Sequence, residues 1–153
     1  MPELTAALLP AARRWWLFVD DQPAAFAGIL RRPHPKAKNI MGVSRLVTLP
    51  DWQGLGLAFV LADHLGALYR AIGERLRTYP AHPALIGGFD RSPRWALVQK
   101  PGMNNVRMGP NSTMAENWRQ DARPNAVFEY RSDALDPAEA RRALSYWPSE
   151  RKR

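Results

Sequence analysis

The fold is decided by residues 49–58, whose sequence is LPDWQGLGLA. The apolar run from Met41 to Leu49 predicts a strand before this stretch, and its two glycines predict a tight turn. An amphipathic helix follows directly, because leucine or isoleucine recurs at positions 57, 61, 65, 68, 72 and 76. The first backbone N–H groups of such a helix have no partner and point to one place. Residues 49–58 therefore predict a binding site for a pyrophosphate.

Upstream of this turn, the chain predicts a hairpin. Two apolar runs at 15–19 and 24–30 are joined by the turn-forming sequence DDQP. Residues 3–14 read as a short helix that Pro10 weakens, and residues 31–39 as a polar loop.

In the strand at 41–49, strict alternation places Val43, Val47 and Leu49 on one face with Arg45. Leu46 and two hydroxyl side chains then take the other face. Within the long helix, Gly66 and Gly73 are expected to lower stability by roughly 1 kcal/mol each relative to alanine.

Downstream, shorter elements alternate. We expect strands at 77–79, 95–99 and 126–130, helices at 83–89 and from 136 onward, and a long irregular loop at 101–125. This order predicts one mixed α/β (α+β) domain spanning 1–153. Its core is at about 15–100, and its last part, 126–153, holds a strand, a helix and a basic tail.

Composition narrows the class of protein. The 153 residues are 46% hydrophobic and 24% charged, which suits one folded domain. No apolar run reaches the ~20 residues of a membrane-spanning helix, and the N-terminus lacks the charge order of a secretory signal. The absence of cysteine excludes disulfides, thiolate metal sites and cysteine nucleophiles. We therefore expect a cytoplasmic protein without a membrane partner.

The net charge points to an anionic partner. Lysine and arginine number 22 against 14 acids, which gives +8. Nucleic acid, a phosphorylated cofactor and a merely solvated basic surface all remain compatible with this surplus. Arg31, Arg32, Lys36 and Lys38 form an acid-free cluster.

Spacing excludes two phosphate-binding motifs. No Lys-Ser/Thr follows the glycines, so the turn is not a Walker loop, and the third glycine of the dinucleotide fingerprint is missing. What remains is Gln-x-x-Gly-x-Ala at 53–58. It resembles the coenzyme A loop of the GNAT acyltransferase superfamily, and the order of elements from 15 to 100 is similar as well. The segment HPALI at 82–86 resembles that of a GNAT subgroup whose strand ends in Leu-Pro-Asp.

The resemblance implies a mostly antiparallel sheet flanked by helices, and acetyl-CoA or another acyl-CoA as cofactor. It places the pyrophosphate on the backbone of Gln53, Gly54, Leu55, Gly56, Leu57 and Ala58. The pantetheine arm would lie along Leu46, Val47, Thr48 and Leu49, on a strand that diverges from its neighbour. An acceptor, usually an amine, would attack the thioester directly. A homodimer is also compatible with the family.

The catalytic groups are less well specified. The family usually donates a proton to the thiolate from a tyrosine, but Phe89 lies near that position, so Ser92, Tyr79 or water would have to replace it. His82 is the first candidate base, because its ordinary pKa is near neutrality; it is equally compatible with a residue that hydrogen-bonds the helix start before Pro83. Asp90 is the next candidate base.

The acceptor is not specified, and the candidates to contact it are Arg45, Trp52, Trp118 and Arg119. The alternatives to a small-amine enzyme are a DNA-base modification enzyme of the phage Mom type and a coenzyme A-binding scaffold without catalysis. The three histidines lack metal-ligand spacing, and no Gly-x-Ser-x-Gly elbow is present, so we expect neither metal nor serine-hydrolase chemistry.

Overall fold

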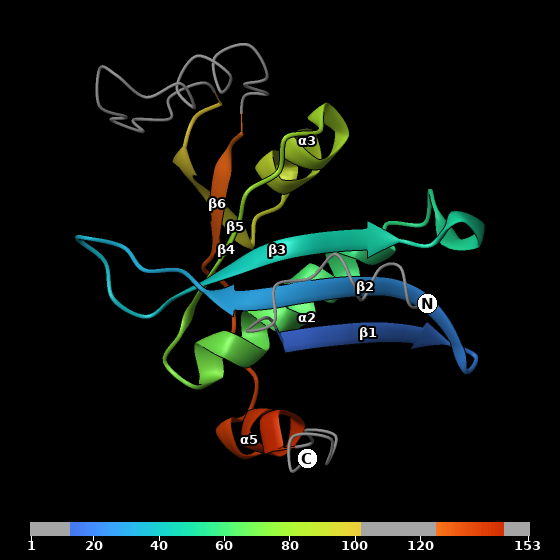
Figure 1. Cartoon of the computed structure of the whole chain (residues 1–153), viewed down its shortest axis with the longest axis horizontal. Helices are drawn as coiled ribbons and strands as arrows, with labels where there is room; N and C mark the ends of the chain where they lie inside the picture. Colours follow the sequence, from blue (N-terminus) through green and yellow to red (C-terminus); the bar gives the residue numbers. More distant parts are fainter. Residues whose placement is uncertain (1–12, 102–124, 146–153) are drawn as a thin grey trace, which may run out of the picture.

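The computed structural model describes residues 13–101 and 125–145. They form a six-stranded sheet in the order β1-β2-β3-β4-β6-β5, in which only β3 and β4 are parallel. The strands are β1 (Arg13–Val19), β2 (Gln22–Arg31), β3 (Ile40–Thr48), β4 (Arg75–Thr78), β5 (Trp95–Gln99) and β6 (Val127–Tyr130). The helices are η1 (Pro50–Trp52), α2 (Leu57–Ala71), α3 (Pro83–Arg91) and α5 (Pro137–Ser145). The mixed, mostly antiparallel fold predicted from the sequence is confirmed (Figure 1).

The first hairpin turns at two aspartates. Asp20 and Asp21 both have positive φ, 47° and 62°, which matches a two-residue turn that follows the natural twist of the strands. The hairpin prediction is thus confirmed. β1 begins at Arg13, so the helix predicted over 3–14 is wrong at its last two residues. The rest of that segment lies outside the described residues.

A bulge in β3 overturns the predicted faces of this strand. Arg45 pairs with Gly28 and Val43 pairs with Ile29, so Ser44 has no opposite residue. Its Oγ donates a hydrogen bond to the carbonyl of Gly28 at 3.1 Å. The extra residue brings Val43 onto the same side as Leu46, and both belong to the core packing, whereas Arg45 is exposed.

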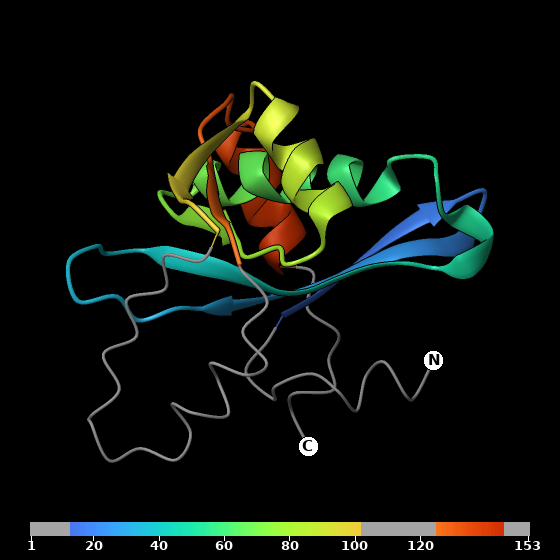
Figure 2. The same cartoon turned by 90° about the horizontal axis from the view of Figure 1, so that it is seen from above.

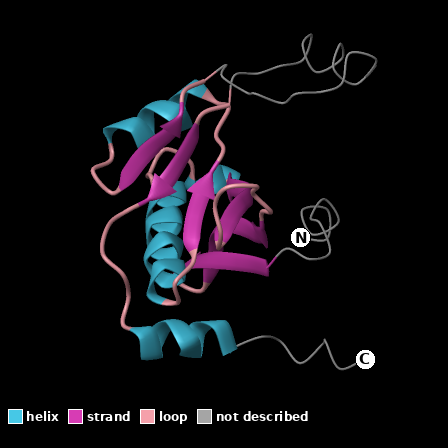
Figure 3. Ribbon diagram, turned by 90° about the vertical axis from the view of Figure 1, so that its left-hand side faces the viewer, coloured by secondary structure: helices cyan, strands magenta, loops and turns pink. Residues whose placement is uncertain are grey.

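The long helix ends earlier than its apolar spacing predicts. α2 stops at Ala71, Gly73 adopts a φ of 80°, and the chain reverses into β4. Leu76, assigned to the helix by the pattern, instead lies in β4 with 1% exposure. α2 packs its buried residues against one face of the sheet, and α3 and α5 lie on that same face (Figure 2). Figure 3 shows the long helix running along the sheet with α5 beyond its end.

The feature that positions the site is a separation between the two parallel strands. β3 and β4 pair only from Ile40 to Gly42, opposite residues 75–77. Beyond Gly42, β3 continues to Thr48 paired with β2 alone, while the chain after β4 turns away toward α3 (Figure 1). The divergence expected of this strand is present, and within the described part of the chain no strand pairs with its inner edge from Val43 to Thr48.

Candidate active site

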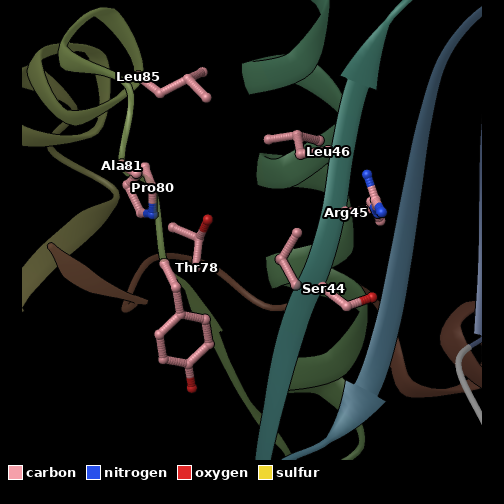
Figure 4. A pocket seen from close by; sticks show the side chains of 9 residues that line it. Ser44, Arg45, Leu46, Thr78, Pro80, Ala81 and Leu85 are labelled. Atoms are coloured by element: carbon pink, nitrogen blue, oxygen red, sulfur yellow. The ribbon is translucent and has the colours of Figure 1, made fainter. Parts of the chain in front are cut away.

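A cavity of about 200 Å³ occupies the opening between β3 and β4. Its walls come from residues 43–46 of β3 on one side and from residues 78–81 with Leu85 on the other. Figure 4 shows Leu46 and Leu85 extending toward each other across the opening. Of the predicted pantetheine residues, Leu46 lines this cavity, while Val47, Thr48 and Leu49 continue along the same strand and its end.

The loop after β3 presents a row of backbone donors. Gly54 and Gly56 have φ of 84° and 72°, a left-handed conformation that favours glycine. Gly56 is the N-cap of α2, and no side chain caps the helix. The N–H groups of Phe59 and Val60 bond to the Gly56 carbonyl, whereas those of residues 54–58 form no hydrogen bond to any residue that the structure describes. Five donors therefore stand at the positive end of the α2 dipole.

The space beside the two glycines holds no atom of the described residues. A Cβ built on Gly54 or on Gly56 would meet no atom within 4 Å. The glycines are thus required by their φ and leave the backbone free to be approached by a ligand. Gln53 ties the loop to the preceding strand, since its Nε2 donates to the Thr48 carbonyl at 3.4 Å. The residues present fit a pyrophosphate.

The three candidate acid–base residues do not line the cavity. His82 is the N-cap of α3: the Ala84 N–H donates to its Nδ1 at 3.1 Å, and its side chain is exposed. Asp90 is exposed near the other end of α3, and Ser92 follows that helix, where its Oγ accepts from the Arg94 N–H at 3.3 Å. The nine-residue helix thus separates His82 from Asp90 and Ser92, so the fold does not gather them into one site.

Phe89, near the position of the family's tyrosine, is a core residue. It is fully buried, with its ring centroid 5.1 Å from that of Phe59, 5.0 Å from that of Trp95 and 5.8 Å from that of Phe128. No part of it lines the cavity.

Tyr79 is the hydroxyl-bearing aromatic residue of the cavity wall. Burial raises the pKa of its phenol, although the charges of Arg32 and Arg77 act in the opposite direction. The ring is covered by Arg32, whose Cζ lies 4.7 Å from the ring centroid. Sequence reasoning missed the role of Arg32, and the available signal was Gly42 within a strand, since such a glycine marks a close approach of another group.

The candidate acceptor contacts are only partly placed. Arg45 is exposed and lines the cavity through β3; Figure 4 shows its side chain on the side of β3 that faces β2. Trp52 is half-buried in η1. Trp118 and Arg119 lie outside the described residues, as does nearly all of the loop predicted at 101–125.

Within residues 13–101 and 125–145, no three histidine, aspartate or glutamate side chains are grouped to hold a metal ion. None of the helices described there has the length and apolar character needed to span a membrane.

Comparisons with known proteins agree with this geometry. The ribosomal-protein-S18-alanine N-acetyltransferase from Escherichia coli superposes with a TM-score of 0.54 at 16% identity, covering 88% of this chain and 77% of the enzyme. An IAA acetyltransferase from Bacillus cereus gives 0.57 at 8% identity, covering 85% and 84%. A Bacillus subtilis acetyltransferase in complex with CoA gives 0.56 at 9% identity, covering 87% and 84%.

At these identities the superpositions show a shared fold. A search of proteins with curated functions found no match. Residues 2–85 match the acetyltransferase (GNAT) family, which is more than half of the chain. By that match, the chain belongs to the GNAT family of acetyltransferases.

Proposed function

We propose that this N-acyltransferase uses acyl-coenzyme A, with acetyl as the acyl group, and transfers it to an amine by direct attack. The observation that carries the proposal is the row of free N–H groups at residues 54–58, which face open space at the start of α2. This row lies immediately after β3, whose inner edge borders the cavity. A phosphate site followed by a narrow apolar opening suits a long thioester cofactor.

The chain would hold the cofactor mainly through its backbone. The free N–H groups of residues 54–58 would bind the pyrophosphate, with that of Gln53 joining them only if it leaves the Pro50 carbonyl, and the edge of β3 at Leu46–Leu49 would bind the amide-rich pantetheine arm as a strand partner would. Bound acyl-CoA supplies the thioester carbonyl. Leu46 and Leu85 would exclude water from that region, because both line the cavity with apolar side chains.

The reaction needs two proton transfers: one proton must reach the departing thiolate, and one must leave the acceptor amine. A phenol is protonated at neutral pH even in water, and burial raises the pKa of Tyr79 further, so its hydroxyl carries a proton that it can donate to the departing sulfur. His82 is the proposed base, because it directly follows the cavity-lining residue Ala81 in the sequence. Its Nδ1 lone pair is occupied by the Ala84 N–H, so it would accept a proton only when this cap opens. Asp90 and Ser92 would act only through water from the far end of α3.

Calorimetry with two acyl donors tests the cofactor. Acetyl-CoA and S-acetylpantetheine share the thioester, but only the first carries the pyrophosphate. The unsubstituted protein should bind acetyl-CoA much more tightly, and Gly56→Trp should remove the difference, because its side chain would occupy the space in front of the N–H groups. A folded, unsubstituted protein that binds both donors equally, or neither, would contradict the proposal.

A further inference from the structure

A cationic side chain stands at the closed end of the cavity. Arg32, the first residue after β2, crosses Gly42 of β3 and stacks on the ring of Tyr79. A Cβ at position 42 would lie 2.5 Å from Arg32 Cγ and 2.8 Å from its Nε, so glycine is needed for this path. Gly42 is also the last β3 residue paired with β4. Arg32 therefore lies where the two strands begin to separate.

The charge of Arg32 has no carboxylate partner among the described residues. The arginine–carboxylate contacts among these residues involve other arginines: Arg31 pairs with Glu74, Arg94 pairs with Asp63, and Arg75, Arg77 and Arg131 share Glu129. Arg45, on the cavity wall, likewise forms no ion pair within residues 13–101 and 125–145. Within the described structure, Arg32 is thus left uncompensated at the opening, and so is Arg45, whose guanidinium lies on the side of β3 that faces β2.

The cavity wall itself contains nothing that would balance these charges. Its nine residues include no aspartate, glutamate or histidine. Glu129, the nearest carboxylate to influence Tyr79, is already shared by three arginines. A positive field of this kind repels cationic acceptors and lowers the pKa of an ammonium group that enters it. The field therefore favours the neutral, nucleophilic form of the amine even though no carboxylate base lines the cavity. Because the same field repels a cationic acceptor, the acceptor needs a second group that is attracted by positive charge.

Resting on the proposed acyltransferase function, we propose that the acceptor is a small amine bearing a carboxylate, which Arg32 anchors. The face of the Arg32 guanidinium is occupied by Tyr79, so its N–H edge is available for the two oxygens of a carboxylate. In the transfer, the nitrogen–carbon bond forms and the carbon–sulfur bond breaks. The electron pair leaves with sulfur, which gains a proton, while the amine releases its own to the proposed base, directly or through water.

The arrangement favours a single anionic group over a nucleic acid. A nucleic-acid surface needs a row of available cations along the backbone path. Here Arg31, Arg75 and Arg77, which flank Arg32 in the chain or on the sheet, are already engaged with glutamates, and Lys36 and Lys38 in the adjoining loop are the nearby cations that form no ion pair with a described residue. The cavity of about 200 Å³ is also of small-molecule scale.

The test compares amines in pairs that differ by one carboxylate. The pairs are L-leucine with 3-methylbutylamine, L-phenylalanine with 2-phenylethylamine, and L-lysine with 1,5-diaminopentane. Full-length protein receives acetyl-CoA, and thiol release is followed. We expect kcat/KM to be higher by about tenfold or more for the carboxylate member of at least one pair, because one charge-assisted hydrogen bond corresponds to a change of this size.

Variants assign the preference to Arg32. Arg32→Met should reduce the preference about tenfold, the same charge-assisted contact being lost. Gly42→Ala keeps the charge but forces the side chain from Tyr79, so it should lower the preference too. Arg70→Met removes an exposed charge at the end of α2 and should behave as the unsubstituted protein. Higher rates with the amines that lack a carboxylate, or an unchanged preference in Arg32→Met, would overturn the proposal.

A second arm needs no cofactor and no turnover. Calorimetry compares N-acetyl-L-leucine with N-(3-methylbutyl)acetamide, the two products of the first pair. Tighter binding of the carboxylate product, lost in Arg32→Met, supports the proposal; equal binding, or salt-sensitive binding of a DNA oligonucleotide in place of both, contradicts it. Acetyl-CoA binding, measured on the same sample, separates this result from failure of the proposed function.

Discussion

Two alanine substitutions at opposite ends of α2 separate backbone strain from cofactor contact. Gly56 and Gly73 have φ of 72° and 80°, and a Cβ at either would meet no atom within 4 Å. Alanine at each position therefore suffers only the left-handed strain of about 1–2 kcal/mol. Both variants should unfold roughly 2–8 °C below the unsubstituted protein, given the usual scaling for a chain of this size.

Affinity for acetyl-CoA should fall in only one of them. The methyl group added by Gly56→Ala lies among the free N–H groups of residues 54–58, whereas Gly73 lies at the far end of the helix. Loss of one charge-assisted hydrogen bond costs about 1.5–3 kcal/mol, or roughly 10- to 150-fold in Kd. Calorimetry should show this loss for Gly56→Ala and about none for Gly73→Ala. Equal affinities in the two variants, with equal thermal shifts, would refute the assignment of this loop to the pyrophosphate.

Three further substitutions test the packing and electrostatics around the site. Gly66→Ala should destabilise the protein by about 1–3 kcal/mol despite better helix propensity, because its Cβ would lie 2.3 Å from Tyr130 Cγ; an increase in the thermal midpoint would contradict this. Burial acts to raise the pKa of Glu129, but hydrogen bonds from Arg77, Arg75 and Arg131 outweigh it and lower the pKa. Its contribution is therefore present above the unfolded pKa and is lost as pH falls through the lower folded pKa, so urea unfolding of Glu129→Gln should lack this part of the acid dependence. Phe89→Tyr should cost about 1–3 kcal/mol by burying an unpartnered hydroxyl, and thiol-release assays should show no gain in rate, since residue 89 does not reach the cavity.

The features that follow from local sequence were predictable. The glycine loop requires φ values that only a few residues adopt readily, and Gly54 and Gly56 supply them. The hairpin follows from two apolar runs around Asp20 and Asp21. The N-cap role of His82 was one of its two predicted interpretations, because an imidazole before Pro83 is placed to accept from the helix start. In each case the relevant interactions lie within a few residues of one another.

Contacts between distant segments explain the features that the hydrophobic periodicity of the sequence did not predict. The bulge at Ser44 arises from the register between β3 and β2, so strict alternation placed Val43 on the wrong face. The spacing of Leu76 fits a helix equally well, but its burial in β4 depends on the turn at Gly73. Gly66, which weakens an isolated helix, makes room for the Tyr130 ring.

The candidate site divides in the same way. The glycine loop at residues 53–58 and its place between a strand and a helix follow from the local sequence, because the backbone conformation there depends on Gly54 and Gly56. Tertiary contacts set the point at which β3 and β4 separate and bring Arg32 across Gly42 onto the ring of Tyr79. These three residues are far apart in the chain, and their meeting depends on the order and register of β2, β3 and β4, which no local pattern encodes.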